Sequence, residues 1–251
     1  MNILVCVKRV PLTGGKIVLT DDQRAISTRH LGFTVSPHEE CGAEEAVRLI
    51  EQHGGSCTVL TLGPAEAEEQ LRDMMALGID RAVHLVTDGE EWDPQATANA
   101  IAAAIQGEPE PYDLILFGNE SADAGNYQVA IRVAHKLGVP VVTGIKGITA
   151  SDGHVRCEQE VPGGRDVYVV PTPAVVTVKE GLNLPRYPSV PGRLRAKRKP
   201  LDTSTPARPE PRLEMVKLTL PPGSGKQADV LGDGAGAAPA VVTVLQELGL
   251  V

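Results

Sequence analysis

Short apolar stretches alternate with amphipathic segments along the first part of the chain. The apolar stretches cover residues 3–7, 57–62, 82–86, 114–117 and 141–145. Between them, apolar side chains recur at helical spacing over 38–53, 65–78, 94–106 and 126–137. Near-continuous apolar runs are typical of strands that are buried on both faces. The pattern therefore predicts an α/β fold, with a mostly parallel sheet and helices on both of its faces.

The first of these helices has a clear start signal. Ser36 is a favoured N-cap residue, Pro37 suits the first helical position, and Glu39 completes a capping box with Ser36. The preceding residues, 12–35, show neither helical nor strand periodicity. We expect an irregular insert there, with a small hairpin over the edge of the sheet.

A second β-rich region covers residues 155–178. Residues 155–161 alternate in part, a Pro-Gly-Gly turn follows at 162–164, and β-rich runs resume at 166–170 and 174–178. The pattern predicts a hairpin followed by a third strand. Two interpretations stay open, namely a solvated β-arm and a surface that docks against another protein.

Prolines dominate the next stretch, residues 182–192. Pro185, Pro188 and Pro191 fix φ there, so we expect a stiff loop and no helix. A stiff loop presents its exposed apolar groups at low entropic cost. A basic cluster follows, formed by Arg193, Arg195, Lys197, Arg198 and Lys199. A docking loop and a solvated, charged tail both explain these features.

The composition changes after Lys199. Residues 200–212 hold four prolines, and residues 222–239 are rich in Gly, Pro and Ala. These features predict an extended, partly flexible arm. Residues 241–250 then show a helical pattern, and this apolar helix must bury one face, on its own core or on a partner. We therefore expect an α/β domain over 1–199 and a C-terminal arm with a helix over 200–251.

Composition narrows the function classes. The 251 residues suffice for one sizeable core with an appended arm, and 42% of them are hydrophobic. The net charge of −8 argues against nucleic acid or an anionic membrane as the main partner. The aromatic content of 3% leaves few platforms for base stacking. No apolar run approaches the roughly 18 residues that span a bilayer, so a membrane-embedded protein is not expected.

The cysteines and the N-terminal residues point to the cytoplasm. Cys6, Cys41, Cys57 and Cys157 are too far apart in sequence to suggest a zinc or iron–sulfur framework. Buried thiols are the expectation for a reducing compartment. Residues 1–7 predict a buried strand, without the basic leader or the cleavage site of an exported protein.

Residues 114–129 predict a strand, a loop of small residues and the start of a helix. Unpaired backbone N–H groups at a helix N-terminus favour anions, and ligands of open α/β sheets bind at the carboxyl ends of strands. A nucleotide site is one interpretation. An ordinary βα loop is the other, because the chain has neither a P-loop nor a G-x-G-x-x-G motif.

No catalytic motif stands out. The six histidines are scattered, and there is no G-x-S-x-G or H-E-x-x-H. An adenine-nucleotide hydrolase or ligase would need a phosphate-cradling glycine loop after the first strand, and residues 8–15 (KRVPLTGG) are a poor candidate. A nucleotide-sensing stress module is a third class, but it would not need the loop and arm after residue 180.

Several motifs, in this order, resemble the β-subunit family of electron-transfer flavoproteins, including its nitrogen-fixation-type members. They are VCVKRVP at 5–11, EEAVRL at 44–49, PAVVT at 173–177, NLPRY at 183–187 and AKRK at 196–199. Each motif alone is weak, but the set covers most of the first 200 residues. The resemblance implies an adenine-nucleotide-binding, Rossmann-like fold and an electron carrier rather than an enzyme.

The resemblance also implies cofactors. FAD would sit mainly in a partner α-subunit, with this chain as one wall of its pocket. The loop 118–129 would bind AMP, or a second FAD in electron-bifurcating members. The implied nucleotide-binding residues are Cys6, Ser36, Gly63, Gly118, Asn119, Asp123, Gly125, Asn126, Tyr127, Gln128 and Val129. Asn119 and Glu120 replace the family's basic residue and Gln, and Gly125 replaces its second Asp, so phosphate contacts would fall to backbone amides.

Partners follow from the same resemblance. The chain would form a heterodimer with the α-subunit, onto which its tail would wrap. Flavoprotein dehydrogenases would donate electrons and a quinone reductase would accept them. The implied docking residues are Leu184, Pro185, Arg186, Tyr187, Val190, Arg195 and Lys197, with Val190 as the apolar anchor.

Overall fold

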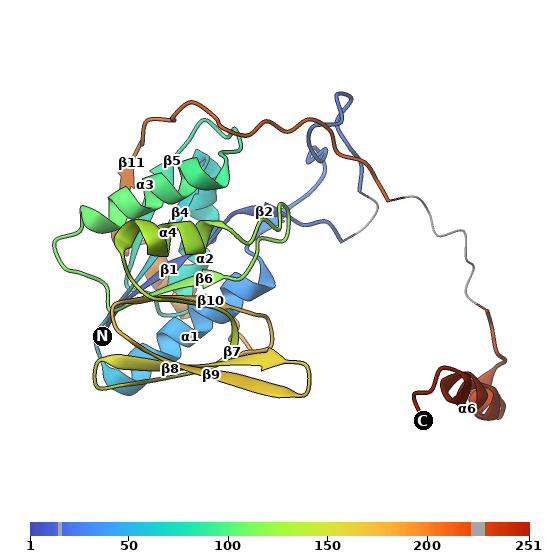
Figure 1. The fold of residues 1–251 in the computed structure, drawn as a ribbon. Coiled ribbons are helices and arrows are strands. Elements are labelled where there is room, and N and C mark those ends of the chain that lie inside the picture. Colours follow the sequence, from blue (N-terminus) through green and yellow to red (C-terminus); the bar gives the residue numbers. More distant parts are fainter. Residues whose placement is uncertain (15–16, 222–228) are drawn as a thin grey trace.

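A nine-stranded sheet forms the centre of the molecule (Figure 1). The computed structural model describes residues 1–14, 17–221 and 229–251. The strands of the sheet are β1 (Asn2–Cys6), β4 (Ser56–Gly63), β5 (Arg81–Val86), β6 (Leu114–Gly118), β7 (Val141–Ser151), β8 (His154–Val161), β9 (Gly164–Pro171), β10 (Ala174–Val178) and β11 (Leu201–Ser204). Their spatial order is β11-β5-β4-β1-β6-β10-β7-β8-β9. All pairings from β11 to β7 are parallel, and those of β8 with β7 and β9 are antiparallel. The predicted α/β fold is confirmed.

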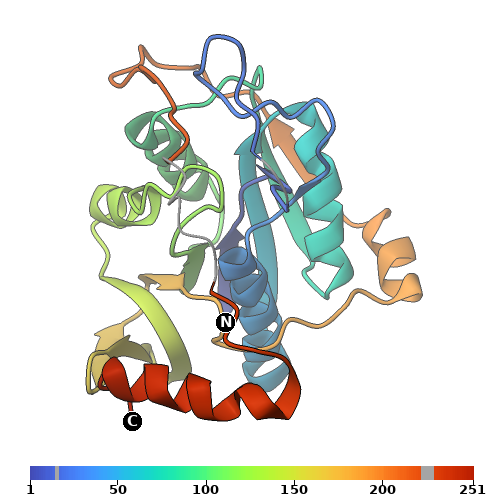
Figure 2. The same ribbon diagram turned by 90° about the vertical axis from the view of Figure 1, so that its right-hand side faces the viewer.

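Helices cover both faces of this sheet (Figure 2). The helices are α1 (Pro37–His53), α2 (Glu68–Ala76), α3 (Pro94–Gln106), α4 (Val129–Leu137), α5 (Val190–Ala196) and α6 (Ala238–Glu247), with short 3₁₀ turns η1 (Ala65–Ala67) and η2 (Gly234–Ala237). Side chains of β1 alternate between the faces, as the pleat of a strand requires. Ile3 and Val5 belong to the core cluster that contains α1 and α2, whereas Leu4 and Cys6 belong to the cluster that contains α3 and α4.

The third strand of the β-rich region lies in the middle of the sheet. β10 pairs in parallel with β6 on one side and β7 on the other, and all five of its residues are buried. A solvated arm is therefore wrong for this strand. The hairpin of β8 and β9 is as predicted, but it extends the sheet, because β7 runs on to Ser151 and pairs with β8. Its outer strand, β9, has no buried residue.

Helix α1 begins where its sequence predicts. Ser36 is the N-cap, and the capping box between Ser36 and Glu39 is present. The Glu39 carboxylate accepts a hydrogen bond from the backbone N–H of Ser36 at 3.3 Å. The insert before α1 is largely irregular, with a short antiparallel pair of β2 (Val10–Pro11) and β3 (Phe33–Thr34) and a bridge between Leu19 and Ile26.

The proline-rich stretch contains a helix, which corrects the prediction for its last residues. α5 begins at Val190, and Ser189 is its N-cap, with the Ser189 Oγ accepting from the N–H of Gly192 at 3.1 Å. Pro191 lies in the first turn of this helix. A proline is tolerated there because the first N–H groups of a helix have no partner inside the helix. Residues 182–189 contain no helix or strand.

The C-terminal arm starts on the sheet and ends away from it. β11 pairs in parallel with β5, so residues after Lys199 add an edge strand to the sheet. The expected helix at the C-terminus is confirmed as α6, none of whose residues is buried. Figure 1 shows α6 apart from the sheet. Residues 222–228 of the Gly- and Pro-rich stretch lie outside the described residues, as does Gly15 of the weak glycine loop. No helix in the described ranges is long and apolar enough to cross a membrane.

Candidate functional site

The strand order creates one crevice at the carboxyl end of β1. From β1 the sheet continues to β4 and β5 on one side, and to β6 and β10 on the other. In open α/β sheets, ligands bind where the strand order reverses in this way, outside the carboxyl ends of the strands. The loops after β1 and β6 flank this point. The loop after β6, residues 118–128, is the predicted nucleotide loop.

This loop packs on the first turn of α1. A Cβ built on Gly118 would lie 2.6 Å from Cγ of Glu39 and 3.3 Å from its backbone nitrogen, so only glycine fits there. The backbone N–H of Ala122 donates to Oγ of Ser36 at 2.9 Å. The N-cap residue of α1 therefore also holds the loop in place. Ser36 is fully buried.

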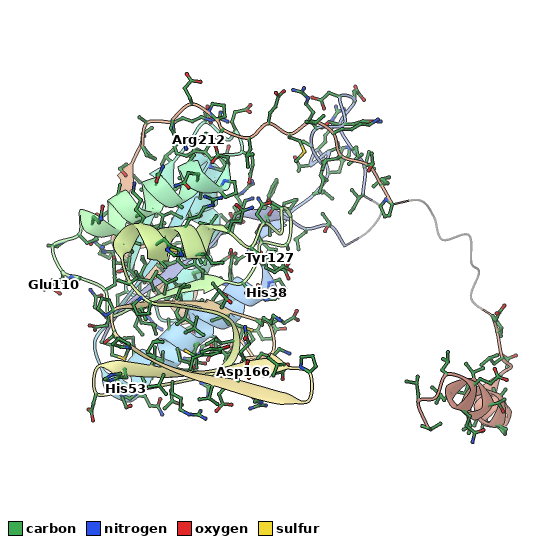
Figure 3. All side chains as sticks on the ribbon, in the orientation of Figure 1. His38, His53, Glu110, Tyr127, Asp166 and Arg212 are labelled. Carbon is green, nitrogen blue, oxygen red and sulfur yellow. The ribbon has the colours of Figure 1, made fainter. Side chains whose placement is uncertain are left out.

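A hollow of about 360 Å³ lies beside the loop. Its lining residues are Pro37, His38, Glu120, Ser121, Ala122, Asp123, Ala124, Gly125 and Glu180. They include three acidic residues and no lysine or arginine. Figure 3 labels His38 and Tyr127 at this end of the molecule, whereas His53 marks the other end of α1. Any phosphate in this hollow would need backbone N–H groups, because the lining residues bring negative charge.

Lys8 forms ion pairs beside the loop. The Lys8 ammonium lies 2.8 Å from a carboxylate oxygen of Asp123 and 2.7 Å from one of Glu91, and so joins the loop after β1 to the loop after β6. Burial opposes ionisation of Asp123, but the ion pair with Lys8 outweighs it and lowers the Asp123 pKa. Burial likewise opposes the charge on Lys8, whereas Glu91 and Asp123 raise its pKa. Lys8 thus holds the loop after β6 close to the loop after β1 through its ion pair with Asp123.

Glu39 is a buried carboxyl group under the loop. Its Oε2 accepts backbone N–H hydrogen bonds from Lys8 at 3.0 Å and from Ser36 at 3.3 Å. Burial nevertheless raises the pKa of Glu39 to about 8, against the lowering effect of those hydrogen bonds and of the Lys8 charge, with the charge of Asp123 as a smaller raising effect. Burial raises the pKa of the neighbouring Cys6 thiol well above its usual value, and the Glu39 charge adds to this effect. The Glu39 carboxyl group and the Cys6 thiol therefore both favour their protonated, uncharged forms.

His38 joins the hollow to a later part of the chain. Its Nδ1 accepts a hydrogen bond from the backbone N–H of Glu180 at 3.0 Å. Because Nδ1 is the acceptor, the ring proton of neutral His38 is on Nε2, which faces a carboxylate oxygen of Glu120 at 3.5 Å. His38, Glu120 and Glu180 were not among the predicted site residues. The only sequence signal for His38 was its position in the first turn of the predicted helix, two residues after the N-cap Ser36.

The structure brings some of the predicted nucleotide-binding residues together. Asp123 and Gly125 line the hollow, and Ser36 and Gly118 support its wall. Gly125 has φ of 54°, a conformation that glycine adopts easily. Cys6 and Gly63 end their strands nearby but are not among the lining residues.

The other predicted residues of the loop have different surroundings. Asn119 fastens the loop to β10, because its N–H donates to the Val178 carbonyl at 2.9 Å and its Oδ1 accepts from Oγ1 of Thr177 at 2.8 Å. Oε1 of Gln128 accepts from the Arg132 guanidinium. Asn126 and Tyr127 are exposed, and Val129 begins α4. α4 was predicted to begin at 126, but Tyr127 has φ of 55°, which interrupts a helix.

The arrangement suits binding better than bond-breaking chemistry. Carboxylates can accept hydrogen bonds from ribose hydroxyls, and the first-turn N–H groups of α4 can face a phosphate. The four cysteines are unpaired and buried. Within residues 1–14, 17–221 and 229–251, no group of three or more His, Cys, Asp or Glu side chains could hold a metal ion. The carboxylates of the hollow can accept hydrogen bonds from the hydroxyl groups of a ligand, and any phosphate of that ligand would depend on backbone amides.

Comparisons with known proteins agree on one family. Residues 25–209 match the family model described as "Electron transfer flavoprotein domain". The electron transfer flavoprotein subunit beta of Bacillus subtilis (strain 168) is 33% identical over 255 residues, covering 98% of each chain. The corresponding subunit of Syntrophomonas wolfei is 36% identical over 88% of this chain and 86% of the relative. That of Bradyrhizobium diazoefficiens is 32% identical over 89% and 90%.

Replacement of Glu39 by glutamine should change the pH dependence of stability. A folded pKa of about 8, above the unfolded value of 4.5, stabilises the fold fully below pH 4.5, and this stabilisation is lost as the pH rises through 8. Glutamine keeps an acceptor oxygen for the two N–H groups and carries no charge. The stability of Glu39→Gln relative to wild type should therefore rise with pH, by about 3–5 kcal/mol between these limits, since one pKa unit is worth about 1.4 kcal/mol.

Urea unfolding at a series of pH values measures this difference. Glu69→Gln is the control, because Glu69 is an exposed acidic residue in the first turn of α2. Parallel pH profiles for wild type and Glu39→Gln would show that Glu39 ionises normally in the folded protein.

Proposed function

We propose a function from one premise: the chain belongs to the electron transfer flavoprotein family, as a β-subunit. It acts as an electron-carrier subunit and forms a heterodimer with an FAD-carrying α-subunit. The flavin performs the redox chemistry, and this chain contributes one wall of the flavin pocket and the docking surface for redox partners. Flavoprotein dehydrogenases donate electrons, and a quinone reductase or another acceptor takes them. The four unpaired thiols agree with a cytoplasmic location.

The main support for the heterodimer is the uncovered apolar face of α6. This helix is rich in valine and leucine, yet none of its residues is buried. Val241, Val242 and Val244 are between 37% and 47% exposed. A helix this apolar needs a surface to cover it, and burial of its side chains stabilises the complex by the hydrophobic effect. The α-subunit is the proposed surface.

The proposed ligand of the hollow beside residues 118–128 is AMP, in a structural role. The switch-point location, the close contact of Gly118 with α1 and the start of α4 support a nucleotide there. The acidic lining favours the ligand with fewer phosphates. This is why AMP is preferred to a second FAD, whose pyrophosphate would bring more negative charge into the hollow.

The segment 182–199 is the proposed docking surface for the electron donor, and we call it the docking segment. Leu184, Tyr187 and Val190 are 92%, 96% and 73% exposed. Such exposure is unusual for apolar side chains on an ordered segment and is typical of binding sites. Arg195 and Lys197 are also exposed and would steer an acidic partner toward this surface.

Co-expression tests the heterodimer directly. The full chain should co-purify with its α-subunit as a 1:1 complex that holds FAD. A chain that ends at Pro221, and so lacks α6, should dissociate from the α-subunit at least tenfold more readily, because the apolar face is gone. Size-exclusion chromatography with light scattering measures the stoichiometry. A full chain that is monomeric, stable and indifferent to the α-subunit would contradict the proposal.

Gly125→Val should remove the bound nucleotide. Valine is β-branched and would be forced into a left-handed backbone conformation, at a cost of about 1–2 kcal/mol, so the loop should shift. The heterodimer should lose AMP while its flavin spectrum changes little. Gly164→Val is the control, because that glycine has an ordinary φ and open space for a side chain.

Extraction of bound nucleotides, followed by chromatography, reads out this experiment. If the wild-type heterodimer contains two FAD and no AMP, the AMP proposal is wrong and the electron-bifurcating alternative takes its place. Unchanged nucleotide content and stability in Gly125→Val would place the phosphate elsewhere.

Val190→Ala should weaken docking of the dehydrogenase. Removing part of the apolar anchor should raise the KM for the heterodimer roughly five- to tenfold, since a buried valine is worth about 1.5 kcal/mol or more. The flavin content and reduction by dithionite should stay the same. Val169→Ala is the matched control, because Val169 is 63% exposed on β9. Figure 2 shows β9 and α5 on opposite sides of the molecule. Equal KM values for wild type and Val190→Ala would remove the segment from the docking site.

A further inference from the structure

The docking segment keeps its apolar side chains exposed, so something else must fix its backbone. Leu184, Tyr187, Val190 and Leu194 all lie on this segment, and each is at least 60% exposed. Residues 182–189 have no regular secondary structure. Leu182, at the start of the segment, packs against the core. The other contacts to the rest of the molecule come from polar side chains and from the few buried positions of α5.

The first anchor holds the segment on α1 through Arg186. Its Nε and Nη2 donate to both carboxylate oxygens of Glu44, at 2.8 and 3.0 Å. Its Nη1 and Nη2 donate to both oxygens of Glu51, at 2.7 and 3.0 Å. The backbone N–H of Arg186 also donates to Glu44, at 3.1 Å. Nearby, Nδ2 of Asn183 donates to the Cys41 carbonyl at 3.0 Å.

The second anchor holds the segment on α2 by two reciprocal caps. Arg72 of α2 donates from Nη1 to the carbonyls of Ala196 and Lys199, at 2.8 and 2.9 Å, at the end of α5. Lys199 in turn donates from Nζ to the carbonyls of Met75 and Ile79, at 3.1 and 2.6 Å, at the end of α2. Arg72 of α2 thus caps the end of α5, and Lys199, three residues after α5, caps the end of α2.

Close packing completes this second anchor. A Cβ built on Gly192 would lie 2.6 Å from the carbonyl oxygen of Ala76, so the backbones of α5 and α2 are in direct contact. Ala196 is 1% exposed on the same face of α5. Lys199 is therefore a structural residue, although the sequence placed it in a basic cluster. Arg195 and Lys197 of that cluster are exposed.

We propose that Arg186 is a positioning residue, which together with the caps of Arg72 and Lys199 orders the docking segment before a redox partner arrives. Every nitrogen of its guanidinium donates to Glu44 or Glu51, so little capacity is left for a partner. An ordered segment loses less conformational freedom on binding, and this strengthens association. The inference rests on the proposed docking function, but it assigns Arg186 a different role from that of a contact residue.

Two conservative variants, one at Arg186 and one at its partner Glu51, separate positioning from contact. Arg186→Lys keeps the charge but cannot form the planar double fork with two carboxylates. Glu51→Gln leaves Arg186 in place and removes one of its partners. Both are made in the full heterodimer with FAD, and the electron donor is the dehydrogenase of the source organism that reduces the wild-type heterodimer fastest.

Each variant should raise the KM for the heterodimer roughly three- to tenfold with little change in kcat, because docking and not electron transfer is affected. The double variant should be no worse than Arg186→Lys alone, since both changes break one interaction. If Arg186 contacts the dehydrogenase directly, Glu51→Gln should leave the KM unchanged or lower it. That result would overturn the proposal.

Hydrogen exchange gives a readout that does not depend on docking. Backbone amides of residues 182–190 should exchange at least fivefold faster in Arg186→Lys and Glu51→Gln than in wild type. Arg165→Lys is the matched control, because Arg165 of β9 lies outside the docking segment and has a surface ion pair with Glu158 at 2.9 Å. In this variant, the exchange of residues 182–190 and the KM should stay within twofold of wild type.

The two readouts keep the proposals apart. Unchanged exchange in Arg186→Lys and Glu51→Gln would refute positioning, whatever the kinetics. Hydrogen exchange could be faster in Arg186→Lys and Glu51→Gln while Val190→Ala keeps wild-type kinetics. That combination would support the positioning role of Arg186 and refute docking at this segment. If Arg186→Lys does not fold, the exposed Glu51→Gln change decides alone.

Discussion

The packing of α1 on the sheet is the constraint on which both proposed functional regions depend. Its first turn supports the nucleotide loop, through the hydrogen bond from Ala122 to Ser36 and the close contact of Gly118 with Glu39. Further along, Glu44 and Glu51 hold the docking segment through Arg186. The apolar face of the helix is buried in the core cluster with β1. A single rigid element therefore sets the position of the nucleotide loop relative to the docking segment.

The candidate site is acidic. Glu120, Asp123 and Glu180 line the hollow, and the nearby Lys8 is paired with Asp123 and Glu91. Glu39 under the loop adds less negative charge, because burial raises its pKa to about 8 and so favours its protonated form. A phosphate must therefore be held by backbone dipoles and not by a lysine or arginine of the lining. Affinity for the proposed nucleotide should therefore come mainly from its nucleoside part.

The docking segment shows how a protein can expose apolar groups without losing order. Polar anchors on α1 and α2 fix the backbone, so Leu184, Tyr187 and Val190 can remain available to a partner. The anchors and the exposed groups alternate along the sequence, which is why NLPRY looks like one motif. In the structure, Asn183 and Arg186 face the molecule, and Leu184 and Tyr187 face the solvent. The sequence alone could not separate these two roles, because both use neighbouring residues.

The sequence by itself determined the α/β class, the start of α1 at Ser36 and the order of β6, a loop and α4, because these depend on local periodicity and capping. It also carried the family motifs. Only the tertiary structure decided that β10 lies in the middle of the sheet, since its apolar run fits a hairpin arm and a buried parallel strand equally well. The ion pairs of Lys8 with Asp123 and of Arg186 with Glu44 could likewise not be predicted from the sequence. These partners are far apart in sequence, and only the order of the strands brings them together.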